Sequence, residues 1–92
     1  MSIFVNQGYY LLTLETGIDI STASTKEILY KKPNGTTGAW TATLEGTTQV
    51  KYQMDNDDLD MAGSWTFQAY VVIGGLDAYG ALFSIEVKET IQ

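Results

Sequence analysis

The chain of 92 residues contains no cysteine and no histidine, and its five basic residues are all lysine, so arginine is absent too. Without cysteine or histidine the chain has no zinc finger, no haem or iron–sulfur ligation, no thiol nucleophile and no Ser-His-Asp triad. Without arginine it has no bidentate clamp for phosphate or carboxylate. These absences argue against most classes of enzyme, and we expect a protein without catalytic activity.

The charge is acidic, with 11 Asp and Glu residues against five lysines and a formal net charge of −6. Phosphate groups repel such a chain, so we expect neither nucleic acid nor an anionic membrane as a partner. The sequence also lacks the run of about 18 apolar residues that a membrane-spanning helix needs. The absence of cysteine is consistent with assembly in a reducing cytoplasm.

The sequence does contain ample material for a hydrophobic core, since 45% of its residues are hydrophobic and 12% are aromatic. The charged fraction is 17%, below the roughly 25% that is usual for soluble domains. The length fits one domain that spans residues 1–92.

Apolar residues alternate with polar ones at a period of two, which predicts strands rather than helices. About seven such rows occur, near residues 3–5, 10–14, 28–32, 40–44, 50–54, 65–73 and 83–87. Turn signals separate them, the clearest being Pro33-Asn34-Gly35 and Gly74-Gly75. A polar stretch near residues 55–60 is expected to form a short helical turn. The pattern predicts an all-β, immunoglobulin-like sandwich of about seven antiparallel strands.

Several apolar residues fall on the face of their strand that should point away from the core. If Trp65 and Phe67 point inward, Tyr70 and Val72 on the same row point outward, and so does Leu82 on the last row. A contiguous exposed apolar patch usually marks an interface, whereas single exposed apolar residues are ordinary. We predict a protein-binding face formed by Leu29, Thr41, Thr43, Tyr70, Val72 and Leu82.

Two other kinds of site remain open from the sequence. Trp40 and Trp65 fall on core rows, but Tyr9 and Tyr79 lie near strand ends, where their rings are free to stack on a sugar. The acidic residues Asp55, Asp57 and Asp58 offer the oxygen ligands that calcium prefers. Their run lacks the glycine and the distal glutamate of an EF-hand loop, so we expect a solvated loop, with calcium as the alternative and no other cofactor.

Two longer motifs make the predictions of fold and function more specific. The segment Leu59–Phe67 reads L-D-M-A-G-S-W-T-F and resembles the corner before strand F of immunoglobulin-type domains. With Thr16–Ile20 and the hairpin Tyr30–Gly35, it resembles small immunoglobulin-like proteins encoded in the structural gene clusters of tailed bacteriophages. The resemblance covers about residues 9–89. Leu29 departs from the pattern, because the look-alikes more often carry a charge at that outward position.

This resemblance implies a structural module of the virion, in the tail, the baseplate or on the capsid surface, and it carries over no catalytic residues. The implied partners are other virion proteins or further copies of the chain, and the implied location is the virion, assembled in the host cytoplasm. The alternative function is an adhesin-like module that binds a glycan on the host surface.

Overall fold

The computed structural model describes residues 3–4, 10–55 and 58–89, and within them it has nine strands and no helix. The strands, in chain order, are β1 (Ile3–Phe4), β2 (Leu11–Glu15), β3 (Thr25–Lys31), β4 (Thr37–Thr41), β5 (Thr43–Glu45), β6 (Gln49–Gln53), β7 (Gly63–Ile73), β8 (Leu76–Tyr79) and β9 (Phe83–Lys88).

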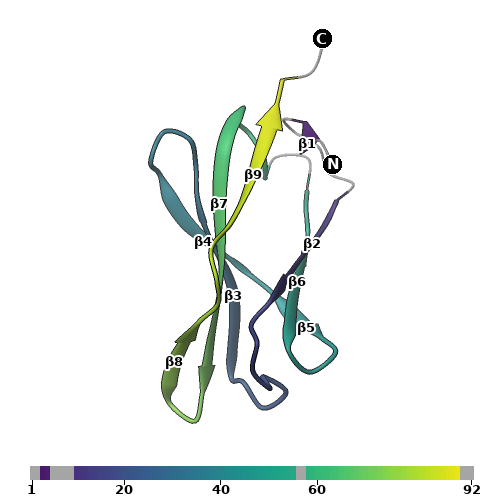
Figure 1. Ribbon diagram of the computed structural model, residues 1–92, viewed down its shortest axis with the longest axis vertical. Helices are drawn as coiled ribbons and strands as arrows, with labels where there is room; N and C mark the ends of the chain where they lie inside the picture. The colour runs from purple at the N-terminus through teal and green to yellow at the C-terminus, as the bar shows by residue number, and fades with distance from the viewer. Residues whose placement is uncertain (1–2, 5–9, 56–57, 90–92) are drawn as a thin grey trace.

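The strands form two sheets that pack face to face (Figure 1). The larger sheet has the order β1-β9-β7-β3-β4, with β8 also paired to β7, and the smaller sheet has the order β2-β6-β5. This strand order is that of an immunoglobulin-like sandwich, so the predicted fold class is confirmed. All strand pairs of the described residues are antiparallel except β1 with β9, which run parallel.

The described residues form more strands than the sequence rows predict, because one row is divided and one strand, β8, corresponds to no predicted row. The row at residues 40–44 is split at Ala42, where the chain passes from one sheet to the other. Thr41 pairs with Glu27 in the larger sheet, whereas Thr43 pairs with Lys51 in the smaller one. Ala42, which lies between Thr41 and Thr43 in the chain, is buried. Its N–H donates a hydrogen bond of 2.9 Å to the carbonyl of Lys26.

The strand that the sequence analysis did not predict is β8, which precedes β9 along the same edge of β7. Tyr70 pairs with Tyr79 and Phe67 pairs with Phe83, so residues 80–82 of this edge face only residues 68–69 of β7. Because three residues of this edge face two residues of β7, the edge has one residue more than its partner. The extra residue makes a β-bulge, which bends an edge strand and interrupts its ladder.

The core lies between the sheets and follows the predicted alternation. Trp65, Phe67, Ala69 and Val71 of β7 are all fully buried, as is Ile28 of β3 opposite them. These residues confirm the register that the sequence predicted for the longest strand, which matters because a slip of one residue would exchange the two faces.

Phe83 is the exception to this alternation, because it pairs with the buried Phe67 and yet is 45% exposed. It lies directly after the bulge in the outermost part of the larger sheet. This inward-facing position is therefore open to solvent, although its partner in the ladder is buried.

Aromatic rings tie the two sheets together. Trp40 of β4 stacks on Tyr30 of the same sheet, with 4.6 Å between ring centroids, and on Tyr52 of the opposite sheet at 4.8 Å. Trp65 lies 6.4 Å from Trp40 and 6.2 Å from Phe67. Aromatic pairs at such distances stabilise a fold by about 0.5–1.5 kcal/mol beyond the area that they bury.

The corner motif and the hairpin motif meet in space. The buried indole of Trp65 donates its Nε1–H to the carbonyl of Met61 at 2.8 Å. The Lys32 Nζ forms an ion pair of 3.0 Å with Asp60 and lies 5.7 Å from the centre of the Trp65 ring. Near residue 58 the chain makes a turn closed by the Asp58 N–H and the Asp55 carbonyl, at 3.1 Å; the described residues show no helix there.

Gly63 makes this meeting sterically feasible. Its φ of +129° is a conformation that side chains disfavour, and a Cβ at this position would lie 2.7 Å from the ring carbons of Pro33. Glycine therefore lets β7 begin directly against the hairpin turn.

We expect Gly63→Ala to lower the free energy of unfolding by about 2–4 kcal/mol through backbone strain and the contact with Pro33. The matched control is Gly46→Ala, because Gly46 also has positive φ but has open space around its Cβ position. The control should lose only about 1–2 kcal/mol. Urea denaturation of both variants measures the difference, and equal losses would contradict the steric argument.

Candidate functional site

The outer face of the larger sheet, on β3, β4 and β7, carries most of the residues predicted to form an interface. Their cross-strand pairs place them together. Glu27 pairs with both Thr41 and Tyr70, and the neighbouring pair joins Thr25 to Val72. Leu29 pairs with Ala39 on one side and with Gln68 on the other. Side chains directly opposite each other in a ladder lie on the same face of the sheet.

Thr43 is not part of this surface, because the chain has crossed to the smaller sheet before it reaches β5. The sequence row from Trp40 to Leu44 predicts one continuous strand, and the crossing at Ala42 is not visible in its alternation. Tyr9, the first of the predicted ligand-facing aromatic residues, lies outside the described residues.

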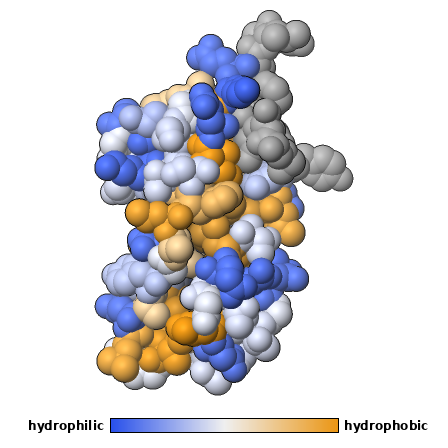
Figure 2. Space-filling view, in the orientation of Figure 1, coloured by the Kyte–Doolittle hydropathy of each residue, from blue (hydrophilic) through white to orange (hydrophobic). Residues whose placement is uncertain are grey.

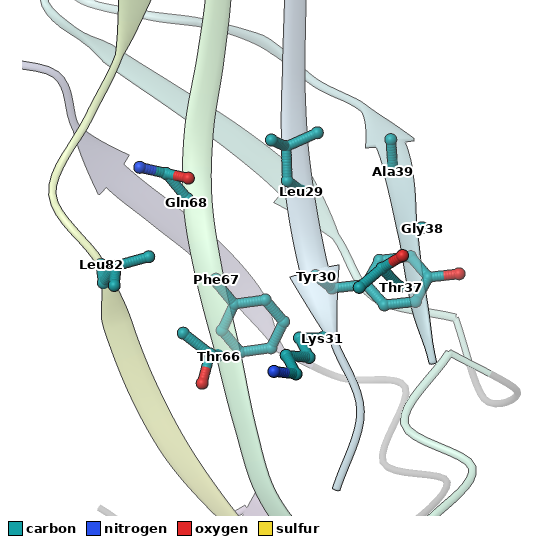
Figure 3. A pocket seen from close by; sticks show the side chains of 10 residues that line it. All are labelled: Leu29, Tyr30, Lys31, Thr37, Gly38, Ala39, Thr66, Phe67, Gln68 and Leu82. Atoms are coloured by element: carbon teal, nitrogen blue, oxygen red, sulfur yellow. The ribbon is translucent and has the colours of Figure 1, made fainter. Parts of the chain in front are cut away.

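A hollow of about 660 Å³ opens on this face (Figure 3). Its apolar side chains come from three places in the chain, namely Leu29 of β3, Ala39 of β4 and Leu82 just before β9. Its polar side chains are those of Lys31, Thr37, Thr66 and Gln68. An apolar hollow with a polar surround is a common form of protein-binding surface.

Of the predicted interface residues, Leu29 and Leu82 line the hollow, and Ala39 and Gln68 are among the lining residues that the sequence analysis did not predict. Ala39 is the hairpin partner of Leu29, which follows from the Pro33-Asn34-Gly35 turn once its register is known. Gln68 has no signal of its own in the sequence. The structure gives it a role in shaping the surface, since its Nε2–H donates to the carbonyl of Gly80 at 2.9 Å and so fixes the bulge beside Leu82.

At the end of the same face, Tyr70 and Tyr79 form an aromatic pair across β7 and β8. Their ring centroids lie 5.1 Å apart, and the Tyr70 hydroxyl donates to Asp77 at 2.9 Å. This hydrogen bond raises the pKa of Tyr70. Tyr79, predicted to face a ligand, is 59% exposed.

In the acidic loop, one of the carboxylates predicted as calcium ligands, that of Asp58, is engaged in hydrogen bonds within the chain. The Asp58 carboxylate oxygen Oδ2 accepts a hydrogen bond from the Tyr52 hydroxyl at 2.8 Å and another from the Asp55 N–H at 2.6 Å. Asp57 lies outside the described residues. Within the described part of the chain, no group of three or more potential metal ligands comes together.

Other carboxylates of the described residues also hold local structure. Glu15 accepts from the Gly17 N–H, and Asp19 accepts from the N–H and the hydroxyl of Ser21. These hydrogen bonds lower the pKa of both carboxyl groups, in each case chiefly through the backbone N–H.

Across residues 10–55 and 58–89, no helix has the length and apolar character needed to cross a bilayer.

Comparison of the chain with protein-family models, with curated proteins and with solved structures finds no match. The resemblance to small phage proteins therefore stays a prediction that depends on the motifs described above.

The Tyr52–Asp58 contact yields a prediction about pH. Burial, and then the hydrogen bond to Asp58, raise the pKa of Tyr52, so folding favours its protonated form. The stability from this contact is complete below the ordinary tyrosine pKa of about 10 and is lost as pH rises above it. We expect Tyr52→Phe to lower the free energy of unfolding at neutral pH by about 1 kcal/mol.

The same variant should show a weaker decline in stability above about pH 10 than the parent chain, because one raised tyrosine pKa is removed. Urea denaturation at a series of pH values measures both effects. Parallel pH profiles for the two proteins would contradict the assignment.

Proposed function

We propose that the protein is a non-enzymatic structural module of a tailed phage particle that contacts neighbouring proteins through the outer face of its larger sheet. The observation that carries the proposal is the apolar hollow between Leu29, Ala39 and Leu82 on the outer face of the larger sheet. The phage setting is supported by the hairpin and corner motifs, which lie against each other through Lys32 and Asp60.

The mechanism of such a module is geometric. The sheets and the aromatic cluster hold the outer face in one shape, so little conformational entropy is lost when a neighbour packs on it. A contact limited to this hollow and its surround is weak by itself, but many copies arranged by particle symmetry add their weak contacts together.

The test is incorporation into particles. We expect Leu29→Lys to fold normally, because the side chain points away from the core, and to reduce the amount of chain that sediments with purified particles by about tenfold, since it places an unpaired charge inside the contact. Quantitative mass spectrometry of purified particles gives the measurement.

The matched control is Leu11→Lys, because Leu11 is an exposed leucine on the opposite sheet. The control should be incorporated like the parent chain. Normal incorporation of Leu29→Lys, or absence of the parent chain from particles, would contradict the proposal.

A second candidate function, binding of a host-surface glycan, is favoured by one observation. The ring of Tyr79 is exposed and supported from the side by Tyr70, which is an arrangement that suits stacking on a sugar face. This function predicts chemical-shift changes at Tyr79 when oligosaccharides are titrated to millimolar concentration, and their loss in Tyr79→Ala. No change in the parent spectrum would remove this candidate.

A further inference from the structure

The edge of the larger sheet formed by β8, the bulge and β9 carries four of the six exposed large apolar side chains of the described residues. Four large apolar residues within eight positions of this edge are open to solvent, namely Leu76 (75% exposed), Tyr79 (59%), Leu82 (69%) and Phe83 (45%). In Figure 2 hydrophobic side chains gather at the lower left, where Figure 1 places β8.

The backbone of this edge is also without a neighbouring strand. In the described residues, β8 pairs only with β7, and β9 has a second neighbour only at Val87 and Lys88, where β1 joins it. The edge from Leu76 to Glu86 therefore offers main-chain hydrogen-bonding groups to another strand.

The apolar side chains project to both faces of the sheet at this edge. Tyr79 lies opposite the outward-facing Tyr70, and Leu82 lines the outer hollow. Phe83 lies opposite the buried Phe67, so it belongs to the inner face. A surface that covers only one face leaves half of these residues in water, whereas an added strand covers both faces at once.

We propose that this edge pairs with the same edge of a second copy of the chain, antiparallel, about a two-fold axis that passes between Gly80 and Ala81. The inference goes beyond the proposed function, since it concerns strand pairing at the edge of the sheet, and of the residues that define the outer hollow it involves Leu82 alone.

The proposed register matches the two edges residue by residue. It places Tyr79 opposite Leu82 of the partner on the outer face, and Ala78 opposite the partner's Phe83 on the inner face. It also places Leu76 opposite Ile85, again on the inner face, and Asp77 opposite Ser84 on the outer face. Every apolar side chain in this register meets another apolar one, and the paired segment ends just before the two residues that β1 already covers.

Charge favours a second copy at this edge over any other place on the molecule. The chain carries a net charge of −6, yet the edge from residue 76 to residue 86 contains only two charged side chains, Glu86 at its end and Asp77, which accepts a hydrogen bond from Tyr70. Natural edge strands commonly carry lysine or proline to prevent such pairing, and residues 76–86 contain neither, since Lys88 lies in the part of β9 that β1 covers.

The bulge lies at the proposed axis, where the two chains approach most closely. Gly80 directs its N–H to the Ala69 carbonyl and receives the Gln68 amide on its own carbonyl, so it offers no main-chain group to the partner. The small side chains of Gly80 and Ala81 allow close approach there. Hydrogen bonding between copies is therefore expected on either side of the axis.

Sedimentation equilibrium of the full chain from micromolar to millimolar concentration tests the proposal. We expect a concentration-dependent dimer that strengthens with added salt, because salt screens the repulsion between two acidic chains. Leu76→Lys and Tyr79→Lys should each raise the dissociation constant by about tenfold or more, since each places an unpaired charge opposite an apolar side chain. Leu11→Lys, an equally charged change on the opposite sheet, should leave it within about twofold.

A pair of substitutions tests the register itself. Ser84 is exposed and should face Asp77 of the partner, so Ser84→Lys should strengthen the dimer and Ser84→Asp should weaken it. Thr13→Lys, on the exposed face of β2, is the control for the change in net charge and should shift association less than Ser84→Lys.

A chain that stays monomeric at millimolar concentration and high salt would overturn the proposal. A dimer that is insensitive to the two edge lysines would overturn the assignment to this edge. These results are independent of the particle experiment with Leu29→Lys, which does not alter the edge.

Discussion

The structure depends above all on the burial of Trp65 at the start of its longest strand. The indole is fully buried, and its only polar hydrogen is satisfied by the Met61 carbonyl within the same corner. That bond fixes the corner relative to β7, and the ring then contacts aromatic side chains of the same face. Lys32 lies beside the ring and holds the hairpin to the corner through Asp60. One side chain thus links the loop, the hairpin and the core.

In this arrangement the apolar side chains of Leu29 and Leu82 on the outer face of the larger sheet take no part in the core between the sheets. The aromatic residues that hold the two sheets together all lie on the inner side, and the described carboxylates near the loops are engaged in turns and ion pairs. Leu29 and Leu82 therefore contribute little to folding where they stand, which is a reason to look for their role in contacts with other proteins. The absence of cysteine, histidine and arginine is consistent with such a role.

The edge formed by β8 and β9 differs from the outer face, because its exposed apolar side chains project to both sides of the sheet. Phe83 lies opposite the buried Phe67 and is still 45% exposed, whereas Leu82 points outward after the bulge and lines the outer hollow. A small acidic domain with one nearly uncharged free edge has a natural place for assembly, and the same property makes that edge a potential site of aggregation.

The sequence by itself determined the fold class, the inward row of β7 and the turns, because alternation and turn chemistry are local properties of the chain. It also placed Leu29, Thr41, Tyr70 and Val72 on one face, since a regular strand has only two faces. Only the tertiary structure decided that Thr43 lies in the other sheet, because the crossing at Ala42 depends on which neighbours complete each ladder. The bulge at Gly80 and the exposure of the inward-facing Phe83 likewise follow from pairing between distant residues, which no local pattern records.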